Sequence, residues 1–194
     1  MALLAYFNEE HIEAGLDEAG RGCLAGPVFA AAVILPKDFE NDLLNDSKLL
    51  SEKNRDMLRE VIENQALAWA VASCDAREID EHNIANASYI AMNRAVAKLK
   101  IKPEFLIVDG KYFKTTDTIP YKPIIKGDSK YAAIAAASIL AKTHRDDYMK
   151  KRTPQYPHYF WEINKGYPTK KHREGIEKHG PCEEHRRSFK LLSY

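Results

Sequence analysis

The chain has 194 residues, with 29 lysines and arginines against 28 aspartates and glutamates, for a formal net charge of +1. Its 45% hydrophobic and 29% charged residues are typical of a folded globular protein and exclude a wholly disordered chain. A charge this small also excludes a uniformly basic nucleic-acid binder, although it allows a local basic face. The length suits a single domain over 1–194, with residues from about 150 to 194 as a helical extension.

Five short segments predict β-strands, the first of them by its alternation of apolar and polar residues. The second is apolar along its whole length and is bounded by prolines, which suits burial on both faces. Pro123 favours an edge position for the fifth, because proline donates no hydrogen bond to a neighbouring strand. The predicted strands cover 12–17, 27–35, 67–74, 105–108 and 121–125.

Helices are predicted between and after these strands. Ser51 is expected to cap the first helix, and Asp75 with Glu78 has the spacing of a capping box. The segment 129–151 is small and apolar on every side in its first half, so we expect it to be buried against the sheet. The others are predicted over 84–99, near 169–179 and over 183–191. Together these elements indicate an α/β protein with a five-stranded mixed sheet flanked by helices.

Carboxylates stand at the ends of predicted elements. Asp17 and Glu18 close the first strand, Asp109 closes the fourth, and Asp128 lies between the fifth strand and the buried helix. Such acids would repel one another unless cations bridged them, and oxygen ligands favour Mg²⁺ or Mn²⁺. Two such ions are a common device for phosphodiester hydrolysis. Asp109-Gly110 also suits a plain turn and Asp128-Ser129 a plain helix cap.

A glycine-rich loop follows the first strand. Its glycines are spaced differently from those of a dinucleotide-binding loop, and acids precede it where a pyrophosphate would lie, so a nucleotide-dependent oxidoreductase is disfavoured. Arg21 lies between two glycines, which suits close approach of the backbone to a sugar-phosphate.

The charge is divided unevenly along the chain. Residues 1–141 carry 16 basic and 21 acidic side chains, and residues 142–190 carry 13 basic and 7 acidic ones. A solvated helical surface would explain the second segment, and so would a face that binds a polyanion. A non-catalytic nucleic-acid binder that uses this segment is therefore the alternative to an enzyme.

The loop sequence GLDEAGRGCLAGPV resembles the first block of the type 2 ribonuclease H family, ribonuclease HII. Further blocks resemble the same family in the same order and cover nearly the whole chain. They are DSKLLS at 46–51, VDG at 108–110, KGDS at 126–129, AASILAK at 136–142 followed by RD at 145–146, and NKGYPT at 164–169 followed by His172.

The resemblance implies an RNase H-like fold and a metal-dependent endonuclease. Such an enzyme would cleave the RNA strand of RNA–DNA hybrids and incise DNA duplexes at embedded ribonucleotides, with a two-metal mechanism that leaves 5′-phosphate and 3′-hydroxyl ends. This activity implies ribonucleotide excision in DNA replication and repair, and we expect a cytoplasmic monomer that is not bound to a membrane.

The resemblance also assigns roles to single residues. Asp17, Glu18, Asp109 and Asp128 would be the catalytic carboxylates that hold two Mn²⁺ or Mg²⁺ ions. Tyr167 would pack on the sugar at the RNA–DNA junction. The residues that read the ribose 2′-hydroxyl would be Gly20, Arg21 and Gly22.

Several further residues allow two interpretations. Lys48 and Lys142 suit phosphate contacts or ordinary surface lysines. Ser138 suits a polar site residue, or packing in which it bonds its own helix. The aromatic cluster ahead of Tyr167 is expected to close the extension onto the core rather than to stack on bases; its members are Tyr156, Tyr159, Phe160 and Trp161.

Overall fold

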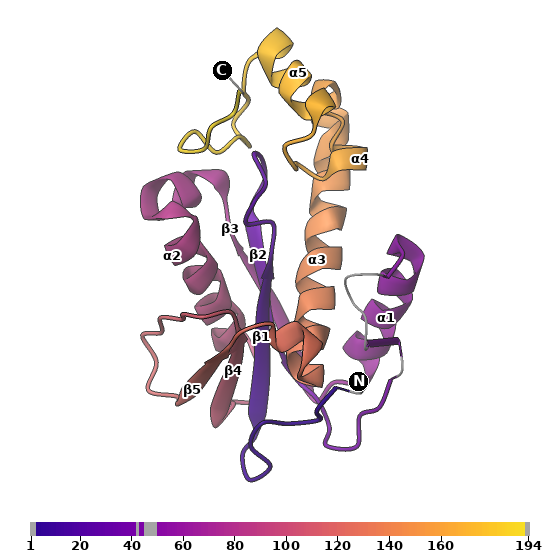
Figure 1. Ribbon diagram of the computed structural model, residues 1–194, viewed down its shortest axis with the longest axis vertical. Helices are drawn as coiled ribbons and strands as arrows, with labels where there is room; N and C mark the ends of the chain where they lie inside the picture. The colour runs from indigo at the N-terminus through magenta and orange to yellow at the C-terminus, as the bar shows by residue number, and fades with distance from the viewer. Residues whose placement is uncertain (1–2, 42, 45–49, 193–194) are drawn as a thin grey trace.

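The protein is described by a computed structural model that covers residues 3–41, 43–44 and 50–192. Lys48, one of the two predicted phosphate contacts, lies outside the described residues. The centre of the molecule is a five-stranded sheet in the order β3-β2-β1-β4-β5 (Figure 1). Its strands are β1 Glu13–Ala19, β2 Val28–Ile34, β3 Ala68–Cys74, β4 Phe105–Asp109 and β5 Tyr121–Ile124.

The sheet is mixed, as the sequence predicts. β1 pairs antiparallel with β2 and parallel with β4, while β3 and β5 form the edges. Pro123 lies in the edge strand β5, where its missing N–H leaves no inner ladder unpaired. β1 and β4 are parallel neighbours in the middle of the sheet. Their carboxyl ends, which carry Asp17 and Asp109, therefore lie next to each other.

Helices cover both faces of this sheet (Figure 1). α2 packs on one face, and α1 and α3 pack on the other. Ser51 caps α1 through the N–H of Asn54, and Asp75 and Glu78 form the predicted capping box of α2. The helices are α1 Glu52–Gln65, α2 Ala76–Ala97, α3 Ala132–Arg152, α4 Trp161–Asn164 and α5 Lys170–His179, with short 3₁₀ turns η2 Gly127–Ser129, η3 Thr153–Gln155 and η4 Pro157–Tyr159.

Two helix predictions need correction, over 183–191 and at the start of the buried helix. The helix expected over 183–191 does not form, because this segment instead pairs with the glycine-rich loop through the bridge between Ala25 and His185. The two helices expected around residue 83 do form, and both lie within α2: they meet at Asn83, whose φ of 63° is not helical and whose Oδ1 accepts the N–H groups of Ala85 and Asn86. The buried helix begins at Ala132 rather than 129, and η2 occupies the intervening turn, so Asp128 is not its N-cap.

The chain beyond residue 150 packs against the end of α3 and the glycine-rich loop. Met149 of α3 shares a buried apolar cluster with Leu24, Trp161 and Ile176. Three of the four predicted aromatic residues, Tyr156, Tyr159 and Trp161, pack on one another and on this cluster, as expected. Phe160 differs, because it is 37% exposed and lies beneath the Lys171 ammonium.

Gly15 allows α3 to lie directly on β1. A Cβ built at this position would lie 2.2 Å from the carbonyl carbon of Ala133, which is backbone and cannot move aside. We therefore expect Gly15→Ala to lower the free energy of unfolding by about 3 kcal/mol or more. Urea unfolding measures this change. Gly22→Ala is the matched control, because no atom lies within 4 Å of its added Cβ; equal stability of both variants would contradict the close contact.

Candidate active site

A cleft of about 400 Å³ opens beside the carboxyl end of β1. It lies between the glycine-rich loop, the middle of α3 and the turn that follows α4. Six residues that the sequence predicts for the site line it: Glu18, Gly20, Arg21, Gly22, Lys142 and Tyr167. The fold therefore brings together residues that are up to 149 positions apart in the chain.

Three of the predicted carboxylates lie close enough to influence one another. Burial raises the pKa of Asp17 well above its ordinary value, and the charges of Glu18 and Asp109 raise it further. Burial also raises the pKa of Glu18, although the Arg21 guanidinium, 3.1 Å away, opposes this shift. The result is a concentration of negative charge in a poorly solvated place, which a cation would relieve.

Asp128 lies next to this group through the backbone. The Asp109 Oδ1 accepts a hydrogen bond of 2.7 Å from the N–H of Gly127, and Asp128 is the next residue in η2. Its side chain is 5% exposed. The structure thus places Asp128 in the turn between β5 and α3, and beside the end of β4.

The carboxylates are not arranged as a finished metal site. Among the described residues, no set of three or more histidine, cysteine, aspartate and glutamate side chains has a metal-binding arrangement. Local partners hold the acids instead: Asp17 bonds Ser138 and the N–H of Glu18, and Glu18 pairs with Arg21. The side chains themselves suit a hard divalent cation, because such ions prefer carboxylate oxygens as ligands. A cation would also offset the repulsion that Asp17 experiences from Glu18 and Asp109.

Ser138 and Arg55 extend the site beyond the residues that the sequence assigned to it. Ser138 lines the cleft and hydrogen-bonds Asp17, so its role as a site residue is favoured over packing alone. Arg55, on the first turn of α1, also lines the cleft and donates a hydrogen bond to the carbonyl of Leu50. No local sequence signal points to Arg55, because only the packing of α1 on α3 brings it here.

The glycines of the loop form a tight turn over residues 20–23. The N–H of Cys23 donates to the carbonyl of Gly20 over 3.3 Å, and Gly20 has a φ of +94°, which favours glycine. A Cβ on Gly20 would also lie 2.0 Å from the Nε of Arg145. Gly20 is therefore required by the backbone and by the side chain beneath it.

Tyr167 lines the cleft next to the glycine turn, where its side chain hydrogen-bonds Cys23, and it is 39% exposed. Its N–H donates to the carbonyl of Asn164 over 2.9 Å. The Lys142 ammonium lies 5.4 Å from the centre of its ring and also pairs with Asp146 at 2.8 Å. The ring is thus held over a cationic neighbour while part of it faces the cleft.

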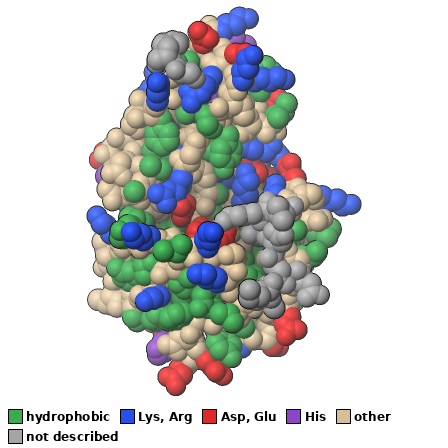
Figure 2. Space-filling model, in the orientation of Figure 1, with side chains coloured by type: hydrophobic (Ala, Val, Ile, Leu, Met, Phe, Trp, Pro, Cys, Tyr) green, Lys and Arg blue, Asp and Glu red, His purple; other side chains and the backbone are tan. Residues whose placement is uncertain are grey.

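The basic segment 142–190 uses many of its charges internally. Arg145 and Arg186 are fully buried, and the Arg152 Nε pairs with Glu184 at 2.7 Å. Figure 2 shows lysine and arginine side chains gathered at the end of the molecule where α5 lies in Figure 1. The cations of this segment that are exposed are Lys151, Lys170, Lys171, Lys178, Arg187 and Lys190.

Comparison with known proteins decides the family. The ribonuclease HII family profile matches residues 14–192. The chain belongs to the ribonuclease HII family. Its fold class and its enzyme class, a metal-dependent ribonuclease H endonuclease, are therefore as the sequence predicts.

Individual relatives agree with this result. Ribonuclease HII of Bacteroides fragilis is 64% identical over 98% of this chain and 94% of its own, and that of Porphyromonas gingivalis is 51% identical over the same shares. The ribonuclease H2 of Pyrococcus horikoshii has a TM-score of 0.78 at 26% identity over 92% of this chain and 94% of its own. Bst ribonuclease HIII, solved with Mn²⁺, shares the fold at 20% identity over 92% of this chain and 67% of its own, with a TM-score of 0.73.

Behind Tyr167 lies a pair of buried histidines. The Trp161 Nε1–H donates to the His172 Nε2 over 3.0 Å, so His172 carries its proton on Nδ1, which donates to the carbonyl of Tyr167 over 2.9 Å. The Nδ1 of His185 accepts a hydrogen bond from the N–H of Cys182. Its Nε2 lies 3.2 Å from the Nε2 of His172, within hydrogen-bonding distance. Both rings are therefore neutral in the folded protein, and His172 anchors the backbone of Tyr167.

These histidines make stability depend on pH. Burial, with a smaller effect of the His172 charge, lowers the pKa of His185 to about 3. Between about pH 6.5 and 3 the unfolded chain binds a proton that the folded chain does not, so stability falls with acidification by up to about 1.4 kcal/mol per pH unit. The free energy of unfolding, measured with urea at several pH values in this range, should fall less per pH unit in His185→Asn than in the wild type. The exposed His11→Asn is the control, and a wild-type dependence of stability on pH in the His185 variant would contradict the account.

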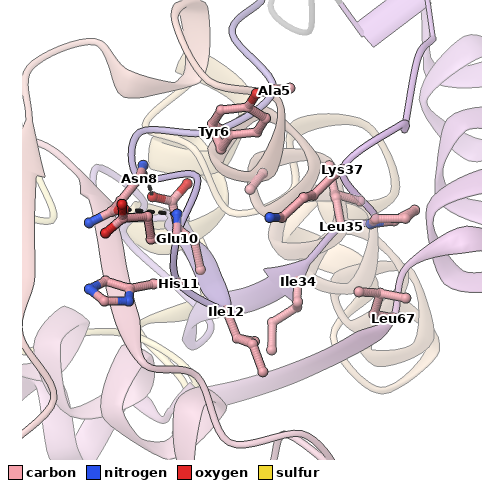
Figure 3. A pocket seen from close by; sticks show the side chains of 13 residues that line it. Ala5, Tyr6, Asn8, Glu10, His11, Ile12, Ile34, Leu35, Lys37 and Leu67 are labelled. Carbon is pink, nitrogen blue, oxygen red and sulfur yellow. Dashed lines mark hydrogen bonds between the residues drawn. The ribbon is translucent and has the colours of Figure 1, made fainter.

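A second pocket, of about 170 Å³, lies at the other end of β1 (Figure 3). It is closed by the segment before β1, residues 3–12, which we call the N-terminal arm. The Glu9 carbonyl of this arm accepts a hydrogen bond of 2.6 Å from the Lys37 Nζ. The carboxylate of Glu13 accepts the N–H groups of Phe7 and Asn8, which fixes the arm against the sheet. None of the residues predicted for the site lines this pocket, so it belongs to the packing of the arm.

No helix in the part of the chain that the structure describes has the length and apolar character needed to cross a membrane.

Proposed function

We propose that this ribonuclease HII cleaves the RNA strand of RNA–DNA hybrids and incises DNA duplexes at embedded ribonucleotides. The products would carry 5′-phosphate and 3′-hydroxyl ends. The observation that supports this proposal is the cleft itself: the glycine turn and Tyr167 line it side by side, and buried carboxylates lie next to it. Cytoplasmic location and monomeric action stay predictions.

Asp17, Glu18, Asp109 and Asp128 would hold two Mg²⁺ or Mn²⁺ ions. When bound, such ions supply activation of water and stabilisation of the leaving oxygen. The protein's own contribution is placement. Ser138 and the N–H of Glu18 orient Asp17, and the N–H of Gly127 orients Asp109. Arg21 pairs with Glu18 and lines the cleft, where its guanidinium would contact the substrate.

Recognition of the ribose would come from the glycine turn and the neighbouring Tyr167. The backbone of Gly20, Arg21 and Gly22 would approach the sugar, since an added side chain would block that approach, and Tyr167 would pack on the neighbouring sugar. Lys142, beneath the Tyr167 ring, would lie near a phosphate. The substrate role of Lys142 and of Lys48 is part of this proposal.

The flanking duplex would bind at the exposed cations of segment 142–190. Because several cations of that segment are buried or paired, the salt dependence of binding should be weaker than its net charge of +6 suggests.

A nuclease assay tests the proposal. The enzyme is offered an RNA–DNA hybrid, a DNA duplex with one ribonucleotide and an all-DNA duplex, each with Mg²⁺ or Mn²⁺ and each with chelator. Metal-dependent incision of the first two substrates alone is expected. Binding of all three without any incision would instead support a non-catalytic nucleic-acid binder.

A further inference from the structure

Two arginines without acidic partners are buried beneath the glycine turn. The side chains of Arg145 and Arg186 are both fully buried, and among the described residues neither makes an ion pair. Burying a charge is costly unless hydrogen bonds compensate it. Here backbone carbonyls accept those hydrogen bonds. Each carbonyl that does so must therefore point toward the interior of the protein.

Arg186 connects the glycine turn to the loop that follows it, because it hydrogen-bonds one carbonyl in each. Its Nη1 donates to the carbonyl of Arg21 over 2.9 Å, and its Nε and Nη2 donate to the carbonyl of Gly26 over 3.0 and 2.8 Å. Arg145 holds the same loop from α3, through the carbonyls of Ala25 and Pro27 at 3.0 Å each. Every carbonyl in these contacts points into the protein.

The Arg186 contact determines the direction of one N–H group. In a trans peptide unit the C=O of one residue and the N–H of the next point in opposite directions, and the described chain has no cis peptide bonds. Because the carbonyl of Arg21 points inward to Arg186, the N–H of Gly22 points outward. Gly22 lines the cleft, so this N–H is presented to the substrate.

The position of Arg186 is itself fixed by backbone pairing. The N–H of Arg186 donates to the carbonyl of Leu24 over 2.9 Å, and the N–H of Gly26 donates to the carbonyl of Glu184 over 2.8 Å. The last segment of the chain thus pairs with the glycine-rich loop and inserts one guanidinium beneath the turn. A lysine could not replace it, because a single ammonium lacks the planar fork that reaches two separate carbonyls.

We propose that Arg186 is a positioning residue that aligns the Gly22 N–H as a hydrogen-bond donor to the ribose and so sets the discrimination between ribonucleotide and deoxyribonucleotide. This inference rests on the proposed function. It differs from a purely structural role, which would affect folding or all nucleic-acid binding alike. An aligned donor instead affects one ratio, the affinity for a duplex with a ribonucleotide over the affinity for an all-DNA duplex.

The test measures that ratio by fluorescence anisotropy, with Ca²⁺ in place of the catalytic ions. The variants are Arg186→Lys, which keeps the charge, and Arg77→Lys, a matched control at an exposed arginine of α2. We expect Arg186→Lys to reduce the ratio by about tenfold through weaker binding of the ribonucleotide duplex alone, as for one lost hydrogen bond, while Arg77→Lys leaves it unchanged. An unchanged ratio in Arg186→Lys, or an equal loss for both duplexes, would overturn the inference.

A second measurement avoids dependence on how the variant folds. In the NMR spectrum of the wild-type protein, the Gly22 amide proton should shift downfield with the ribonucleotide duplex more than with the all-DNA duplex. An equal response to both duplexes overturns the inference even if Arg186→Lys does not fold. A wild type without preference for the ribonucleotide duplex would overturn the proposed function, whereas a wild type with that preference and an unaffected Arg186 variant would overturn only the role of Arg186.

Discussion

Replacing Asp109 by asparagine is expected to reduce kcat for incision by a factor on the order of 10³. The substitution keeps an oxygen that can accept the N–H of Gly127, so the junction of β4 and η2 stays in place. It removes the negative charge that the proposed metal site needs. Steady-state kinetics on a duplex with one ribonucleotide gives the measurement, and affinity for that duplex should change little.

Asp117→Asn is the matched control for this prediction. Asp117 is exposed in the loop between β4 and β5, and its Oδ1 accepts the N–H of Thr118, a contact that asparagine preserves. Its incision rate should equal that of the wild type. If Asp109→Asn retained wild-type kcat, the assignment of Asp109 to catalysis would be wrong.

Removing the Tyr167 ring should lower the rate of incision at a lone ribonucleotide by roughly tenfold to a hundredfold. This is the usual effect of losing one aromatic contact with a nucleotide. The ring is half-exposed on the cleft wall, and its backbone is anchored independently by Asn164 and His172. Tyr167→Ala therefore removes the contact without releasing the turn. Affinity for an all-DNA duplex should fall much less than the incision rate.

Tyr6→Ala provides the comparison for Tyr167→Ala. Tyr6 is 37% exposed, close to the 39% of Tyr167, but lies in the N-terminal arm at the other end of β1. Its removal should leave incision unchanged. Equal losses of duplex affinity and incision rate in Tyr167→Ala would mean that Tyr167 is only structural.

The central elements of this fold follow from local sequence patterns. The apolar residues of β2 and of the first half of α3 predict that both elements are buried. The sequence also places acids at the ends of β1 and β4, and the structure adds that these strands are parallel neighbours, which brings the acids together. Ser51 and Asp75 cap their helices as their residue types suggest. These features depend on contacts within a few residues or on one simple rule of sheet geometry.

The failed helix prediction over 183–191 and the incomplete interpretation of Gly20 have a common physical cause, which is long-range pairing. The segment 183–191 has a pattern that suits an amphipathic helix, but His185 and Arg186 are buried by contacts with residues 24–26, far away in the chain. Gly20 was interpreted only as a place of close approach to substrate, whereas Arg145 beneath it also excludes a side chain. No window of local sequence contains both partners of such contacts.

The central claim is that Asp17, Glu18, Asp109 and Asp128 form a divalent-cation site beside the cleft. The most direct test is titration of the protein with Mn²⁺, with the free ion followed by electron paramagnetic resonance. The account predicts saturable binding by the wild type and by Asp117→Asn, and an affinity weaker by about tenfold or more in Asp17→Asn and Asp109→Asn. Equal Mn²⁺ affinity in all four proteins would contradict it.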